Sequence, residues 1–131
     1  MKIYVVNTNR TNSYDDDSDM IGHQKCAAYY DPWKYKIDDI KANDLVFLYR
    51  NGVGIIARGI ATGIVEISDY NGDKDEEHYM NLNNFEYLRK PLPASLIKTI
   101  TGIDHVFSQT MFSINYDQGI NVWRHITRNC L

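Results

Sequence analysis

The sequence predicts an α+β fold in which a curled mixed sheet, a pseudo-barrel, is flanked by short helices. The main evidence is the stretch 44–65, which has the pattern of two strands joined by a tight turn. Residues 46–49 are apolar without interruption, as is typical of a strand buried on both faces. Asn51-Gly52 is a strong hairpin signal, because both central residues of a type I′ turn have positive φ. Glycines 54, 59 and 63 of the return strand indicate bulges and close backbone approach, and such features curl a small sheet.

The N-terminal third of the chain combines a strand, a polar loop and a short helix. Within residues 2–7, β-branched side chains alternate with other residues, and this pattern predicts a first strand. A polar loop is predicted to follow, and the acidic run 15–19 to prolong it. The segment 20–30 remains open between a helical stripe and a strand. Pro32 predicts a turn before a short helix from Tyr35, and Asn43 is suited to the left-handed residue that ends it.

The second half of the chain reads as strand, helix, strand and helix. The acidic segment 69–77 is predicted as a surface loop, and 78–88 as one or two strands. Pro93 favours the start of a helix that Gly102 ends. A strand over 106–114 and an amphipathic helix over 117–129 complete a single domain, 1–131, without internal repeats.

Composition places the chain among ordinary globular domains. It has 131 residues, a formal charge of −3 and ten tyrosines against four Phe and two Trp. Tyrosine suits pockets and interfaces, because its ring packs while its hydroxyl stays hydrated. Two cysteines form no disulfide framework, and no signal peptide or apolar run of about 20 residues is present. We therefore expect a cytoplasmic protein without a membrane partner.

Charge is distributed unevenly along the chain. Two acidic runs fall within 15–19 and 69–77, whereas 89–131 holds five basic residues and two acidic ones. This pattern fits a solvated surface of mixed charge, or a basic face that binds a polyanion opposite acidic loops.

Motifs for cofactors are lacking. His23 and Cys26 have half the spacing of a zinc site, but no second pair follows. No glycine-rich phosphate loop or calcium-binding loop is present, and neither cysteine lies in a recognisable nucleophile motif. The sequence thus predicts no cofactor, no metal site and no catalytic residue.

Several segments resemble the PUA-like superfamily, and within it the EVE and YTH domains. The resemblance rests on residues 37–44 with the strand 46–49 and Gly54 to Gly59, and extends to 5–7, 92–93 and 107–110. The chain departs from the pattern at Asn43, where most relatives have glycine. It also lacks the Gly-x-Lys-x-x-Glu-x-Arg signature of the ASCH branch, which argues against a nuclease or hydrolase of that kind.

The resemblance implies a concave pocket that receives a flipped, modified nucleobase. A base reader needs aromatic faces for stacking and polar groups for the base edge. By matching order along the chain, the expected base-pocket residues are Asn7, Thr8, Tyr29, Tyr30, Trp33, Tyr49, Phe107 and Gln109. Phosphates would be held at the rim by Arg10, Lys34, Arg50, Arg58 and Arg124.

The sequence therefore favours a non-catalytic domain that binds DNA or RNA and reads a methylated base. Some relatives serve as specificity modules of restriction systems, so the resemblance also implies an effector protein as a partner. Two alternatives remain: an enzyme of the same fold acting on a nucleotide or RNA, and a module that binds a small ligand or a protein. A titratable residue in the pocket would favour the first, and the acidic charge balance favours the second.

Overall fold

The computed structural model describes residues 1–131 and has the predicted α+β composition. Helices and strands alternate irregularly along the chain, and the strands form a mixed sheet. The elements are β1 (Ile3–Asn7), α1 (Tyr14–His23), β2 (Lys25–Tyr29), the 3-10 helix η1 (Trp33–Asp39), β3 (Leu45–Arg50), β4 (Gly54–Ala61), β5 (Glu66–Tyr70), β6 (Asp73–Leu92), α2 (Ala94–Thr101), β7 (Met111–Ile114) and α3 (Tyr116–Asn129).

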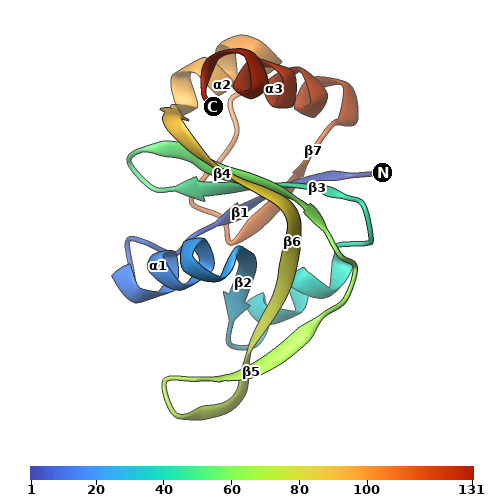
Figure 1. Cartoon of the computed structure of the whole chain (residues 1–131). Helices are drawn as coiled ribbons and strands as arrows, with labels where there is room; N and C mark the ends of the chain where they lie inside the picture. The colour runs from blue at the N-terminus through green and yellow to red at the C-terminus, as the bar shows by residue number, and fades with distance from the viewer.

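Seven strands form one strongly curled sheet in the order β2-β6-β4-β3-β1-β7, with β5 paired to β6. Strands β1 and β3 run parallel, and every other neighbouring pair is antiparallel. The 20-residue strand β6 pairs with β2 and β5 through its first half and with β4 through its second half. This single long strand carries the sheet around its curve (Figure 1).

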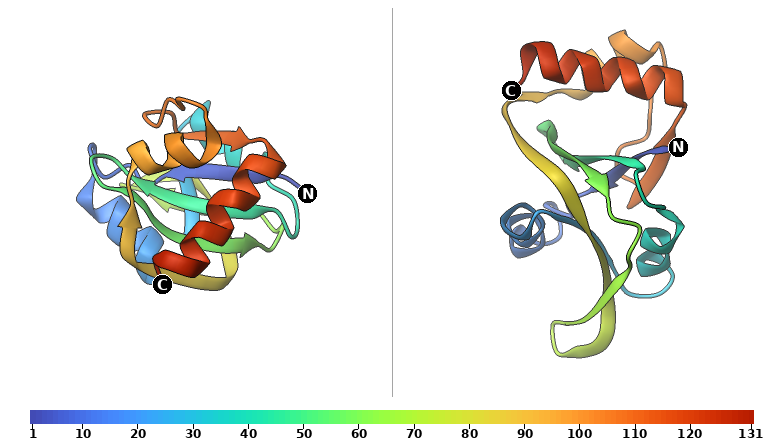
Figure 2. Two further views of the ribbon diagram at one scale, coloured as in Figure 1. Left: turned by 90° about the horizontal axis from the view of Figure 1, so that it is seen from above. Right: turned by 45° about the vertical axis from the view of Figure 1, so that its right-hand side comes forward.

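Helices cover the two faces of the sheet and bury two hydrophobic cores. Because successive strand residues face opposite sides, Val46 and Leu48 pack toward α1 and η1, whereas Phe47 packs toward α2 and α3. Helices α2 and α3 lie side by side over the second face (Figures 1 and 2). None of the helices has the length and apolar character needed to cross a bilayer.

Glycine positions in β4 explain the curl. As predicted, 46–49 pairs antiparallel with 55–59, with Val46 opposite Gly59. A Cβ atom at Gly59 would lie 2.6 Å from the side chain of Leu82, and one at Gly54 would collide with the backbone of Leu92. The pairing of β4 with β6 also shifts register at two points, so the expected bulges are confirmed.

The turn that joins β3 to β4 differs from the predicted type I′ turn. Gly52 has φ +78°, but Asn51 does not adopt positive φ. The N–H of Val53 donates to the carbonyl of Arg50 at 3.0 Å and closes the turn. Only Gly52 therefore requires the left-handed region here.

The loop predicted over the acidic run 15–19 is wrong, because these residues belong to α1. Ser13 is the N-cap, and its Oγ accepts a hydrogen bond from the N–H of Asp16 at 3.2 Å. Carboxylates in the first turn also oppose the positive end of the helix dipole. Asp16 and Asp17 are 5% and 1% exposed, so this part of the acidic run is buried rather than solvated.

The surface loop predicted over 69–77 is also wrong, because the segment forms the β5–β6 hairpin. Asn71 and Gly72 have φ of 51° and 82°, which is the backbone that a type I′ turn requires. The first half of β6 pairs with β2 on its other side, and this pairing fixes the acidic segment in the sheet.

The other predicted helices and strands are present with changed bounds. The segment 20–30 divides between the end of α1 and β2. Asn43 adopts φ 71°, Pro93 precedes α2, and Gly102 ends it with φ 73°. Of the predicted strand 106–114, only Met111–Ile114 pairs, and it does so with β1.

Candidate functional site

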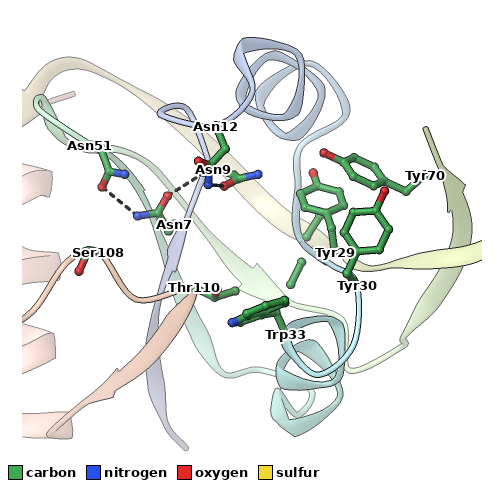
Figure 3. Close-up of a pocket in the computed structure, with 12 residues that line it drawn as sticks. Asn7, Asn9, Asn12, Tyr29, Tyr30, Trp33, Asn51, Tyr70, Ser108 and Thr110 are labelled. Carbon is green, nitrogen blue, oxygen red and sulfur yellow. Dashed lines mark hydrogen bonds between the residues drawn. The ribbon is translucent and has the colours of Figure 1, made fainter. Parts of the chain in front are cut away.

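A pocket of about 470 Å³ opens beside the ends of β1 and β2. Its volume lies within the range of about 300–1,000 Å³ that small-ligand sites occupy. No charged side chain lines it. The lining residues are Asn7, Asn9, Asn12, Ala27, Ala28, Tyr29, Tyr30, Trp33, Asn51, Tyr70, Ser108 and Thr110. In Figure 3 the asparagines form one wall and the tyrosines form the other. Trp33 lies between the tyrosines and Thr110.

The asparagine wall lies at the carboxyl ends of two parallel strands. Asn7 ends β1 and is in register with Tyr49 of β3, so Asn7 and Asn51 come to the same edge of the sheet. In open α/β sheets, ligands bind outside the carboxyl ends of the parallel strands, and the one parallel pair of this sheet has the same arrangement at this edge. Asn9 and Asn12 follow in the next loop, where Asn9 has φ 60°.

Hydrogen bonds fix the amide of Asn7. Its Nδ2 donates to Oδ1 of Asn51 and to the carbonyl of Phe107, both at 2.9 Å. Its Oδ1 accepts from the N–H of Asn9 at 2.7 Å. A carboxamide oxygen can accept two hydrogen bonds, so Asn7 retains one acceptor position in the pocket.

Asp16 links the two walls from behind the pocket. Its Oδ2 accepts from Nδ2 of Asn9 at 2.8 Å and from the hydroxyl of Tyr70 at 2.7 Å. Because Asp16 is buried and does not line the pocket, its charge orients these two side chains without contacting a ligand directly.

The tyrosine wall is a cluster of three rings. Tyr70 stacks on Tyr29 with ring centroids 4.2 Å apart, and Tyr30 meets Tyr70 edge-on at 5.3 Å. The Tyr30 hydroxyl donates to Oδ2 of Asp73 at 2.7 Å. Tyr70 comes from β5, so the hairpin predicted as a loop supplies part of this wall.

Trp33 begins η1 directly after the turn that follows β2. It is 50% exposed and Tyr30 is 37% exposed, whereas Tyr29 is only 8% exposed. The first two rings thus keep accessible surface at the pocket. Ala27 and Ala28 of β2 add two methyl groups to the lining.

The pKa values of the three tyrosines keep the pocket uncharged. Burial, with nearby carboxylates such as Asp16, raises the pKa of Tyr29. Burial and the hydrogen bond to Asp16 raise the pKa of Tyr70. The hydrogen bond to Asp73 raises the pKa of Tyr30. All three phenols therefore remain neutral hydrogen-bond donors at neutral pH.

Asp17 anchors the loop that carries the asparagines. It accepts from the hydroxyl of Thr8 at 2.6 Å and from Nε and Nη2 of Arg50 at 2.9 and 2.7 Å. Burial would raise the pKa of Asp17, but the hydrogen bonds from Arg50 and Thr8 and the charges of Arg50 and Arg10 outweigh it and lower the pKa. This contact ties α1 to the ends of β1 and β3.

Four of the eight predicted base-pocket residues line this pocket: Asn7, Tyr29, Tyr30 and Trp33. Thr8 is fully buried and bonds to Asp17 behind it. Tyr49 lies two residues after Phe47 and so faces the α2–α3 side, where it stacks on Phe107 with centroids 4.3 Å apart.

Gln109 is exposed outside the pocket, and its Nε2 donates to the carbonyl of Val106 at 3.0 Å. The expectation that Thr8, Tyr49, Phe107 and Gln109 line the cavity is therefore wrong.

The predicted phosphate-binding residues are mostly engaged elsewhere. Arg50 is held by Asp17, and Nζ of Lys34 lies 3.3 Å from Glu76. Nη1 of Arg10 lies 3.5 Å from Asp17, with its guanidinium 3.9 Å from the ring centre of Tyr14.

Two of the predicted phosphate-binding residues lie away from the pocket. Arg58 is buried against Glu86 and Trp123, and Arg124 is exposed on α3. Their expected place at the rim is wrong, because the side chain of Arg58 on β4 packs against α3 and Arg124 belongs to α3 itself.

Sequence reasoning missed several residues of the pocket. These residues come from loops and from the hairpin, and folding brings them together across long stretches of chain: Asn9, Asn12, Asn51, Tyr70, Ser108 and Thr110. The sequence identifies Asn51 only as a turn residue. The rule that ligands bind at the carboxyl ends of parallel strands would have favoured Asn51, had the β1–β3 pairing been foreseen.

Comparisons with known proteins identify the fold. No protein-family model matches the chain, and no curated protein matches it. Among solved structures, it is similar to the YTH domain of Mmi1 in complex with RNA, with TM-score 0.65 and 10% identity, over 97% of this chain and 78% of that one.

A second similar structure is that of Rpa0253 from Rhodopseudomonas palustris. It matches with TM-score 0.57 and 11% identity, over 98% of this chain and 92% of that one. The chain thus has a YTH-like fold.

Proposed function

We propose that this domain binds nucleic acid by inserting one base into the pocket between Trp33 and the asparagine wall. The observation that carries the proposal is the composition of the pocket, which combines exposed aromatic faces with amides and no charged side chain. A nucleobase is a neutral, flat ring with hydrogen-bonding edges, and readers of flipped bases bind such a ring by stacking and by polar contacts to its edge. The neighbouring YTH structure with RNA supports a nucleic-acid ligand.

The base is proposed to carry a methyl group. The exposed rings of Trp33 and Tyr30 and the methyl groups of Ala27 and Ala28 provide apolar surface for such a group. Transfer of a methyl group from water to such a surface is favourable, whereas the N–H that the methyl group replaces would lose a hydrogen bond to water there.

A second candidate is a free aromatic small molecule of nucleoside size. It is favoured by the pairing of Arg50 and Lys34 with Asp17 and Glu76, which leaves few basic groups beside the pocket for a phosphate chain. An enzyme would need a titratable group in the cavity. Those present are tyrosines with raised pKa values, so we do not propose catalysis.

The experiment measures the binding of a panel of short oligonucleotides, modified and unmodified, by fluorescence anisotropy. Stacking on an aromatic side chain is worth ~1–3 kcal/mol per base, so Trp33→Ala should weaken binding about five- to 150-fold. Tyr116→Ala is the matched control, because Tyr116 is 42% exposed on α3 and does not line the pocket.

Both variants should fold, since neither ring is in the core. Equal binding by wild type and Trp33→Ala across the whole panel would overturn the proposal. Binding of free nucleosides with no gain from a nucleotide chain would favour the small-molecule candidate.

A further inference from the structure

The C-terminal part of the chain carries a net positive charge because acidic residues are scarce there. Residues 1–88 contain nine Lys or Arg and fifteen Asp or Glu, whereas residues 89–131 contain five and two. Of these two acidic residues, Asp104 pairs with Lys98 at 3.5 Å, and Asp117 lies in the first turn of α3. The protein is therefore acidic over most of its length and basic around α3.

Helix α3 has two faces of opposite character. Val122 and Ile126 are fully buried against the sheet. On the outer side, residues 121, 124, 125 and 128 follow the i, i+3, i+4, i+7 spacing of one helical stripe, and three of the four are basic or imidazole side chains. Arg124 and Arg128 are exposed, and neither takes part in an ion pair.

This stripe lines a second pocket of about 370 Å³, to which α2 contributes Ile100. The other lining residues are Asn121, Arg124, His125, Arg128 and Asn129. No carboxylate is among them, so two unpaired guanidinium groups and several polar side chains face one shallow cavity. Cations in the last turn of a helix also offset its dipole, and Arg128 is placed for this. Arg124 lies a turn earlier, so the dipole does not explain the whole stripe.

We propose that the α3 stripe, meaning Asn121, Arg124, His125 and Arg128, binds the phosphodiester backbone of a nucleic acid. Guanidinium groups bind phosphate oxygens through paired N–H donors. This proposal deepens and rests on the proposed function, because it names a second contact region for the backbone of the same strand, beyond the nucleotide whose base is inserted. Arg10, Lys34 and Arg50 near the aromatic pocket are already paired with carboxylates. The unpaired guanidinium groups of α3 are better placed to replace the counterions of a phosphate chain.

The two sites lie on different faces of the sheet. Helix α3 covers one face, whereas β2, η1 and β5, which supply the aromatic wall, lie on the opposite side in Figures 1 and 2. The α3 stripe is therefore a separate contact region, and the two sites can be tested with two different probes. Base recognition and backbone affinity then depend on different residues.

The test crosses two variants with two probes. The variants are Trp33→Ala and the double variant Arg124→Gln/Arg128→Gln. The probes are a nucleoside, which has a base but no phosphate, and an abasic oligodeoxynucleotide, which has the backbone but no bases. The double variant should lose most of its affinity for the abasic strand and keep its affinity for the nucleoside. Trp33→Ala should show the reverse.

Salt dependence provides a second readout. On single strands each phosphate contact contributes roughly 0.7 to the slope of log affinity against log salt, so the double variant should lower the slope by about 1.4. The control is Lys2→Gln/Lys41→Gln, which removes the same charge from two exposed lysines that form no ion pair. It should leave the slope nearly unchanged.

An equal loss of slope in both double variants would overturn the α3 site, because it would show only a general charge effect. Binding of phosphatidylserine vesicles or an acidic peptide, with no binding of the abasic strand, would also overturn it. If the protein binds the abasic strand but not the nucleoside, the proposed base pocket is wrong and the α3 site stands. The two proposals can therefore be rejected independently.

Discussion

Tyr70 lies flat against Tyr29, with ring centroids 4.2 Å apart and ring planes inclined by 24°. One face of Tyr29 is thus already covered by a residue of the β5–β6 hairpin. A ligand in the pocket meets the accessible rings of Tyr30 and Trp33 instead. The hairpin therefore shapes the pocket, and the hydrogen bond from Tyr70 to Asp16 holds it there.

We predict that Tyr70→Phe destabilises the protein by about 1–2 kcal/mol, because the ring stack is kept while buried Asp16 loses one donor. Urea unfolding measures the change. Tyr116→Phe is the control, since the exposed Tyr116 hydroxyl forms no hydrogen bond within the protein. Equal midpoints for the two variants would show that the contact contributes nothing to stability.

We predict a larger effect at Asp17. Asp17→Asn keeps the volume of the side chain but leaves the Arg50 guanidinium without its charged partner. Removing one member of a buried ion pair costs about 3–5 kcal/mol, and the partial exposure of Arg50 places this variant near the lower end. Asp39→Asn, at an exposed carboxylate without an ion pair, should change the unfolding free energy by less than about 0.5 kcal/mol.

The lowered pKa of Asp17 predicts part of the loss of stability at acid pH. The folded-state pKa of Asp17 is lowered, so its stabilising contribution is complete above the unfolded value of about 4. The contribution is lost as pH falls through the folded-state pKa, because the unfolded chain binds the proton first. The difference in unfolding free energy between wild type and Asp17→Asn should therefore shrink below about pH 4. A difference that stays constant from pH 7 to pH 3 would contradict this assignment.

Replacing either of two glycines that have free space around them with alanine should change the unfolding free energy, in opposite directions at the two positions. Gly52 has φ +78°, so Gly52→Ala should cost about 1–2 kcal/mol. Gly22 lies in α1 with ordinary φ, so Gly22→Ala should stabilise by about 0.5–1 kcal/mol. At either position a methyl group meets no atom within 4 Å outside its own stretch of chain, so thermal unfolding of the pair isolates the backbone effect. Destabilisation of equal size in both would argue against the turn geometry.

Local patterns were sufficient to predict the central hairpin and α3. The uninterrupted run 46–49, the glycines of β4 and the spacing of Ile120, Trp123 and Ile126 are all signals within a few residues. The sequence does not predict helix α1, because a run of acidic residues is typical of a solvated loop, although Ser13 is a suitable N-cap and accepts a hydrogen bond from the N–H of Asp16.

Long-range pairing explains the errors at the site. Asn7 and Asn51 meet only because β1 and β3 pair in parallel, and Tyr70 reaches Tyr29 only because the hairpin folds back. The β1–β3 pairing leaves no signal within one segment. The hairpin does leave one, Asn71-Gly72, but the acidic composition of 69–77 favours a surface loop and outweighs it. Tyr49 was assigned to the pocket by its place on the central strand, whereas strand alternation directs it toward α3.

The central claim is that a base enters the uncharged pocket and contacts Trp33. Intermolecular NOEs between the base protons of a bound nucleoside and the assigned protein protons test it most directly. We predict NOEs from the base to the indole ring of Trp33 and to the ring of Tyr30, together with shifts of the Asn7 side-chain amide. If the protein is saturated with nucleoside and NOEs arise only elsewhere on the surface, with none to either ring, the claim is contradicted.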